Sequence, residues 1–168
     1  MKYSLMRKFD VTNGPGIRST IFVSGCTHNC EGCFNEDLQS FDYGTEWDLK
    51  AEKEFISFVE NPVVVGVNIL GGEPLQQTMD DSLVNLLEKL KTKFPDKSIW
   101  LWTGDTFEDA ILNEKKFEII KYCDVIIDGK FELENRNIKL KYRGSKNQRV
   151  IDVLKSLETG TTVTFDVD

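Results

Sequence analysis

The feature that most constrains this chain is a group of three cysteines, Cys26, Cys30 and Cys33, spaced as CxxxCxxC shortly after the apolar run 20–23. Three thiolates in one short loop form an incomplete metal cage. A cubane iron–sulfur cluster normally takes four cysteines, one for each iron, so three would leave one iron without a protein ligand. Because an open coordination position is where a metal site binds substrate, the spacing predicts chemistry at an iron.

Two other cysteine chemistries stay open from the spacing alone. Tetrahedral zinc would take a fourth ligand, either His28 between two of the cysteines or Cys123 far along the chain. A redox dithiol would use only Cys30 and Cys33 and would leave Cys26 without a role. We expect His28 to be a loop residue near the cluster that donates a hydrogen bond. Cys123 follows a helical apolar pattern, which predicts a buried, unreactive thiol.

Size and composition indicate a soluble globular protein with one core. The 168 residues suffice for a single domain, 1–168, and a content of 40% hydrophobic and 29% charged residues is ordinary for such a protein. The longest apolar stretch, 63–70, is too short to cross a bilayer, and residues 1–8 lack the apolar region of a signal peptide. We therefore expect a cytoplasmic protein with no membrane partner. The net charge of −7 argues against nucleic-acid binding, since nucleic-acid binders usually carry a basic footprint.

Apolar periodicity predicts short strands that alternate with helices. We expect strands at 18–23, 63–70, 98–102, 125–127 and 161–167, and helices at 47–59, 80–94, 106–122 and 148–157. Thr45 is expected to cap the first helix. The alternation implies a parallel sheet with right-handed crossovers. Because a full eightfold barrel takes about 250 residues, we expect an α/β fold in the form of a partial, open (βα) barrel of mainly parallel strands.

The unusual residues of the chain follow the strands of this expected sheet, at the edge where such sheets place their active sites. The cysteine loop follows the first strand, and the segments after the next three are 71–74 (GGEP), 102–105 (WTGD) and 128–129 (DG). In the glycine turn, Gly71 and Gly72 would let the backbone come close to a ligand, and Glu73 offers a carboxylate to an ammonium group. Alone, this segment also fits an ordinary strand-to-helix turn. It lacks the residues of a Walker loop or a GxGxxG fingerprint.

These motifs together resemble those of the radical S-adenosylmethionine superfamily. Within it, the chain resembles the family of activating proteins of anaerobic (class III) ribonucleotide reductases. The segments that carry this likeness, in order and spacing, are 13–18 (NGPGIR), 25–35 (GCTHNCEGCFN), 99–104 (IWLWTG), 124–130 (DVIIDGK) and 143–148 (RGSKNQ). Phe34 stands where the family often has tyrosine, and Glu73 stands where it often has aspartate. The stretch after Arg149 carries no matching motif.

The resemblance implies two cofactors and a set of binding residues. Cys26, Cys30 and Cys33 would bind three irons of one 4Fe-4S cluster, and S-adenosylmethionine would chelate the fourth iron. An electron from the cluster would cleave the cofactor into methionine and a 5′-deoxyadenosyl radical. The implied cofactor-binding residues are Gly71, Gly72 and Glu73 at the methionine amino end, Gly32, Cys33 and Phe34 at the adenine, and Thr103 and Asp128 at the carboxylate or ribose.

The resemblance also implies two protein partners. The radical would take a hydrogen atom from a glycine in the large subunit of the anaerobic reductase, and a low-potential donor such as flavodoxin or ferredoxin would supply the electron. The chain has no insertion that would cover the site, so the reductase would cover it, with Arg18 and Arg143 clamping a carboxylate or docking the glycine loop. Two other functions stay open. One is a small radical enzyme of the deazapurine-forming type that acts on a free small molecule, and the other is a non-catalytic zinc or iron–sulfur module.

Overall fold

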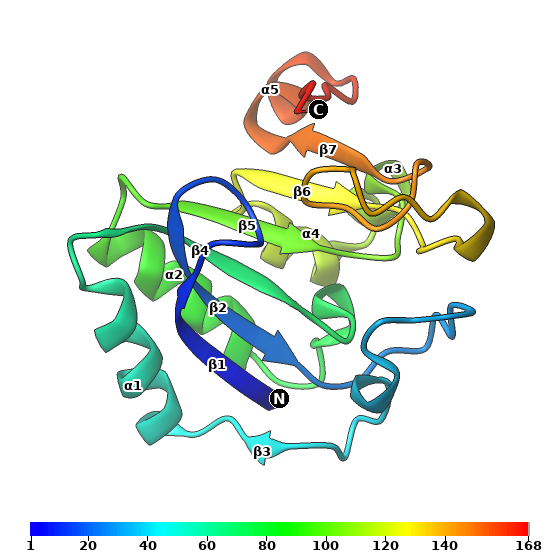
Figure 1. The fold of residues 1–168 in the computed structure, drawn as a ribbon. Coiled ribbons are helices and arrows are strands. Elements are labelled where there is room, and N and C mark those ends of the chain that lie inside the picture. The colour runs from blue at the N-terminus through cyan, green and yellow to red at the C-terminus, as the bar shows by residue number, and fades with distance from the viewer. Residues whose placement is uncertain (168) are drawn as a thin grey trace.

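A seven-stranded mixed sheet runs through the computed structural model, which describes residues 1–167 (Figure 1). The central strands are parallel, and the others run antiparallel to their neighbours. The sheet is not closed, because β3 and β7 lie at its two edges. The α/β class is confirmed, and the partial barrel stays a prediction. The spatial order is β3 (Thr45–Glu46), β1 (Lys2–Asp10), β2 (Ile17–Val23), β4 (Val64–Gly71), β5 (Ser98–Trp102), β6 (Val125–Asp128) and β7 (Arg149–Asp152).

Helices that pack on one face of this sheet form the main core with it. Buried side chains of Phe55, Leu86 and Ile119 join Ile21 and Ile69 of the sheet in one apolar cluster. Figure 1 shows α2 and α4 on the same side of the sheet. The helices are α1 (Leu49–Val59), α2 (Ser82–Lys93), α3 (Phe107–Ile111), α4 (Glu114–Ile120) and α5 (Val153–Thr159), with short 3₁₀ turns η1 (Glu36–Gln39), η2 (Pro74–Gln76) and η3 (Leu133–Asn135).

The opposite face of the sheet is covered by loops rather than by these helices. Successive side chains of a strand point to opposite faces, so Ile99 and Leu101 of β5 join the main core while Trp100 faces away from it. Tyr142, in the long segment between β6 and β7, packs on Trp100 with a ring-centroid distance of 5.3 Å. The turn between β1 and β2 also covers this tryptophan through Gly14. The loops on this face become the walls of the site.

Most of the expected elements are confirmed. The four strands predicted between residues 18 and 127 appear as β2, β4, β5 and β6, and the first two helices appear as α1 and α2. The cap of α1 was predicted wrongly: Thr45 lies in β3, and it is Asp48 whose side chain accepts from the N–H of Ala51. The single helix predicted at 106–122 is divided into α3 and α4, because Asn113 begins a new helix by accepting from the N–H of Lys116.

The carboxyl-terminal predictions were wrong. Residues 149–152, predicted as the start of a helix, form β7, which pairs antiparallel with β6 and buries Val150 and Ile151. The helix α5 begins only at Val153, where Asp152 caps it. The strand predicted at 161–167 is reduced to one bridge between Ile151 and Thr164. The strands β1 and β3 were not predicted, because they lack a run of buried apolar residues. Within residues 1–167, the helices are too short and too polar for any of them to span a bilayer.

Candidate iron–sulfur and cofactor site

The three cysteines lie in the loop between β2 and η1, at the carboxyl end of β2. Backbone hydrogen bonds fix both sides of this loop. The N–H of Gly25 donates to the carbonyl oxygen of Leu38 at 2.8 Å, and the N–H of Glu73 donates to the carbonyl oxygen of Gly25 at 2.8 Å. Gly25 adopts a φ of 103°, which disfavours other residues. The loop is thereby attached to the carboxyl end of β4.

Backbone N–H groups lie close to the cysteine sulfurs. The N–H of Asn35 lies 3.4 Å from Sγ of Cys33. Burial raises the pKa of the Cys26 and Cys30 thiols, although hydrogen bonds from the backbone of His28 and of Phe131 act in the opposite direction. Metal binding deprotonates a coordinating thiol outright, and N–H groups directed at the sulfurs are one way in which a protein tunes an iron–sulfur cluster.

The spacing of the three sulfurs fits separate irons better than one zinc ion. Within residues 1–167, the one group of three possible metal ligands whose ligand atoms all lie within 4.8 Å of one another is His28, Glu73 and Asp105. A tetrahedral zinc ion with Zn–S bonds of about 2.3 Å would hold its sulfurs closer together than that. The three sulfurs do not all lie that close together, an arrangement that suits a cluster, in which each thiolate binds its own iron.

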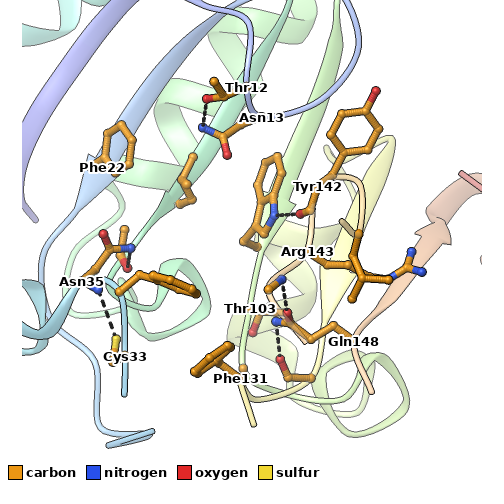
Figure 2. A pocket seen from close by; sticks show the side chains of 18 of the residues that line it. Thr12, Asn13, Phe22, Cys33, Asn35, Thr103, Phe131, Tyr142, Arg143 and Gln148 are labelled. Atoms are coloured by element: carbon orange, nitrogen blue, oxygen red, sulfur yellow. Dashed lines mark hydrogen bonds between the residues drawn. The ribbon is translucent and has the colours of Figure 1, made fainter. Parts of the chain in front are cut away.

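A cleft of about 560 Å³ lies beside the cysteine loop, on the loop-covered face of the sheet (Figure 2). Figure 2 shows Cys33 and Asn35 on one side of the cleft, with Arg143 and Gln148 on the other. The strand ends of β4 and β5 contribute to its lining. The sequence-predicted site residues that line it are Cys33, Phe34, Gly71, Gly72, Thr103 and Arg143.

Glu73 and Asp128, two predicted cofactor-binding residues, lie outside this lining. Their carboxylates accept hydrogen bonds from other groups of the protein. The Glu73 side chain is 1% exposed, and its oxygens accept from the backbone N–H groups of Leu75 at 2.9 Å and Gly104 at 2.7 Å. Asp128 is also 1% exposed and accepts from the N–H of Phe107 at 2.8 Å. Asp128 also pairs with Arg149, whose Nε lies 3.0 Å from Oδ1. In this conformation both carboxylates hold the strand ends in place.

Arg18 lies inside the protein and is not placed to dock a partner. Its guanidinium is 0% exposed, with Nε 2.6 Å from Oδ1 of Asn68. One terminal nitrogen donates to the carbonyl oxygens of Val67 and Ser98, at 2.9 and 2.8 Å. The surface role expected for Arg18 is therefore replaced by a structural one: it joins β2, β4 and β5 from within. Three further predicted residues, Gly32, Cys26 and Cys30, also lie outside the lining. Gly32 is exposed near the Leu133 side chain, and the two cysteines are half-buried.

The glycine turn is close to the chain's own backbone. A Cβ atom at Gly72 would lie 2.6 Å from the carbonyl oxygen of Gly25 and 2.8 Å from that of Leu38. Gly71 adopts a φ of 117°, and its carbonyl oxygen accepts from the Asn35 side chain at 3.2 Å. These glycines therefore let the cysteine loop pack against the end of β4. That they also leave space for a ligand stays a prediction.

Several cleft residues were not singled out in the sequence. Asn35 was part of a quoted motif, and its side chain now proves to bond Gly71. Phe131 stacks near Phe34 with ring centroids 5.0 Å apart, and Trp102 donates from Nε1 to the carbonyl oxygen of Tyr142 at 2.7 Å. Phe131 and Tyr142 belong to the segment between β6 and β7, which has no periodic pattern. Only their position in the fold brings them to the cleft.

Comparisons with known proteins agree with this site. Residues 12–151 match the family model described as a 4Fe-4S single cluster domain, a range that includes all three cysteines of the loop. The chain is 41% identical over 150 residues to the anaerobic ribonucleoside-triphosphate reductase-activating protein of Enterobacteria phage T4, covering 89% of this chain and 93% of the relative. It is 38% identical to the protein of that name from Vibrio cholerae, covering 88% and 96%.

A further bacterial relative has the same name and a lower sequence identity. The Escherichia coli K12 protein is 32% identical over 152 residues, covering 89% of this chain and 97% of the relative. The matches therefore span nearly the whole length of both chains. With a 4Fe-4S domain and relatives of one name at these identities, the chain belongs to the family of anaerobic ribonucleoside-triphosphate reductase-activating proteins.

Proposed function

We propose that this protein is an oxidoreductase of the radical S-adenosylmethionine class, folded as the single domain 1–168. Cys26, Cys30 and Cys33 hold the 4Fe-4S cluster. With S-adenosylmethionine bound, the reduced cluster supplies a 5′-deoxyadenosyl radical, which generates a glycyl radical on the large subunit of anaerobic ribonucleoside-triphosphate reductase. The observation that carries the proposal is that Cys33 lines the same cleft as Gly71, Gly72 and Thr103.

The cleft has the size and lining that a nucleoside-containing cofactor requires. Its volume of about 560 Å³ lies within the range of small-molecule sites. The rings of Phe34 and Phe131 form an apolar wall next to Cys33, which suits an adenine base. The ends of β4 and β5 bring backbone polar groups to the lining of the cleft. These features support S-adenosylmethionine as its occupant.

The rim of the cleft supports a protein as the final substrate. Phe34 and Ile138 line the cleft and are 62% and 85% exposed, and Val11 nearby in the β1–β2 turn is 71% exposed. Large apolar side chains exposed around one opening are typical of a surface that another protein covers. A reductase segment seated there would exclude water from the radical, with Arg143 beside it. The electron would come from a low-potential donor such as flavodoxin or ferredoxin.

The proposal is tested by product analysis under anaerobic conditions. Protein reconstituted with iron and sulfide, reduced and mixed with S-adenosylmethionine should release methionine and 5′-deoxyadenosine slowly. Addition of the large reductase subunit should make the cleavage productive. The same protein with Cys33→Ala serves as the control and should release neither product. Turnover of a free small molecule at full rate with no protein partner would instead favour the deazapurine-type function.

A further inference from the structure

The ring of His28 lies where three segments of the site meet. Its Nε2 atom is 2.8 Å from Oε2 of Glu73, and the same oxygen accepts from the N–H of Gly104 at 2.7 Å. The other oxygen accepts from the N–H of Leu75 at 2.9 Å. Because an ionised carboxylate only accepts hydrogen bonds, this contact requires a donor hydrogen on Nε2. The cysteine loop, the end of β4 and the end of β5 are thus joined through one carboxylate.

This group of hydrogen bonds is shielded from water. The His28 side chain is 10% exposed and that of Glu73 is 1% exposed. Asp105 lies near the same ring nitrogen, with Oδ1 3.7 Å from Nε2, and its second oxygen pairs with Lys116 of α4. Hydrogen bonds to a charged group contribute more than neutral ones, and a buried group left without its donor is costly. The contact between His28 and Glu73 is therefore expected to hold the loop firmly.

Gly104 leaves the space that the ring occupies. A Cβ atom at this position would lie 2.5 Å from Cδ2 of His28 and 2.8 Å from Nε2. The backbone of Gly104 is outside the left-handed region, so the approach of the ring is what excludes a side chain here. A methyl group at position 104 would displace the ring without removing it.

We propose that His28 is a positioning residue that sets the distance between the cysteine loop and the cofactor-facing ends of β4 and β5. Gly72 and Thr103 line the cleft and directly precede Glu73 and Gly104, the two residues that meet at the ring. A shift of the ring therefore moves the floor of the cleft relative to the cysteines. The inference rests on the proposed function in taking S-adenosylmethionine as the occupant of the cleft.

The test is a double-substitution cycle on His28 and Gly104. His28→Ala removes the ring and Gly104→Ala displaces it, so each should weaken S-adenosylmethionine binding to the cluster-loaded protein by about tenfold. In the double variant the methyl group enters space that the ring has left, and binding should be no weaker than in either single variant. His28→Gln, whose amide can still donate to Glu73, should stay within about threefold of wild type. Glu31→Ala, an exposed change in the same loop, is the control.

Two measurements decide the outcome. Anaerobic titration calorimetry gives the dissociation constant, and urea unfolding of the cluster-free protein gives a readout that involves no cofactor. In binding and in unfolding, the free-energy loss of the double variant should be smaller than the sum of the losses of the two single variants. Effects of the two substitutions that are independent in binding and in unfolding would overturn the proposal. If wild-type protein fails to bind S-adenosylmethionine, the proposed function is wrong, and the unfolding cycle still decides whether the two residues act together.

Discussion

Arg18 donates from Nε to Oδ1 of Asn68 across 2.6 Å, in the centre of the sheet and out of contact with solvent. Burial lowers the pKa of this arginine to about 10, so the group is still cationic at neutral pH. Gly14 and Gly66 provide the space around it, since a Cβ at either position would lie within 3.0 Å of the arginine side chain. A buried charge with this many donors organises the strands rather than binding a partner.

Removing the Arg18 guanidinium should therefore lower the stability of the folded protein, and any loss of activity should follow from that. Arg18→Met leaves the Asn68 side chain and the Ser98 carbonyl oxygen without their donor, and we expect a loss of about 3 kcal/mol in the free energy of unfolding. Arg18→Lys should recover only part of it, because an ammonium group lacks the planar fork. Urea unfolding measures both. Wild-type stability combined with a failure to activate the reductase would restore a docking role for Arg18.

Three of the four cysteines should be required for the cluster, and Cys123 should not. Replacing Cys26, Cys30 or Cys33 with alanine should remove the cluster, measured as loss of about four irons and four sulfides per chain. Cys123→Ala should keep the full iron content, because this thiol is buried and its Sγ donates to the carbonyl oxygen of Ile119 at 3.5 Å. Loss of the cluster in Cys123→Ala alone would contradict the three-thiolate site.

Asp10 should make the free energy of unfolding depend on pH. Burial opposes ionisation of this carboxyl, but hydrogen bonds from Asn13, Thr12 and Thr20 outweigh it and lower the pKa from 3.8 to about 2. Ionised Asp10 therefore adds about 2 kcal/mol to the free energy of unfolding above pH 3.8. This contribution is lost as the pH falls from 3.8 through 2.

Urea unfolding of cluster-free protein compares Asp10→Asn with wild type. The variant should be less stable at pH 7, and the difference should shrink to less than half at about pH 2.5. The exposed Asp96→Asn is the control. A difference between Asp10→Asn and wild type that stays constant over this range would show that the hydrogen bonds do not depend on the charge of Asp10.

Charge reversal at Arg143 should affect activation of the reductase more than binding of S-adenosylmethionine. Arg143 lines the cleft over which the reductase segment is proposed to sit. Arg143→Glu should lower the glycyl radical yield by about tenfold, while the S-adenosylmethionine dissociation constant changes by less than about threefold. Lys53→Glu, an exposed change of equal charge on α1, should alter neither. An equal loss of cofactor affinity and radical yield would place Arg143 in the cofactor site.

The sequence predicted what depends on local patterns. Continuous apolar runs identified β4 and β5, and the cysteine spacing identified the cluster loop. The apolar pattern of 148–157 favours a helix, and only pairing with β6 makes the first part of this segment a strand. The burial of Arg18 and the bonds of Glu73 could not be predicted, since their partners lie far along the chain and meet only in the folded sheet.

The most direct test of the central claim is electron paramagnetic resonance of the reduced, cluster-loaded protein mixed with S-adenosylmethionine and the large reductase subunit. We expect a glycyl radical doublet that requires all three components and disappears when the target glycine of the reductase is replaced by alanine. Cluster-loaded protein that binds the reductase and S-adenosylmethionine but yields no doublet would contradict the claim.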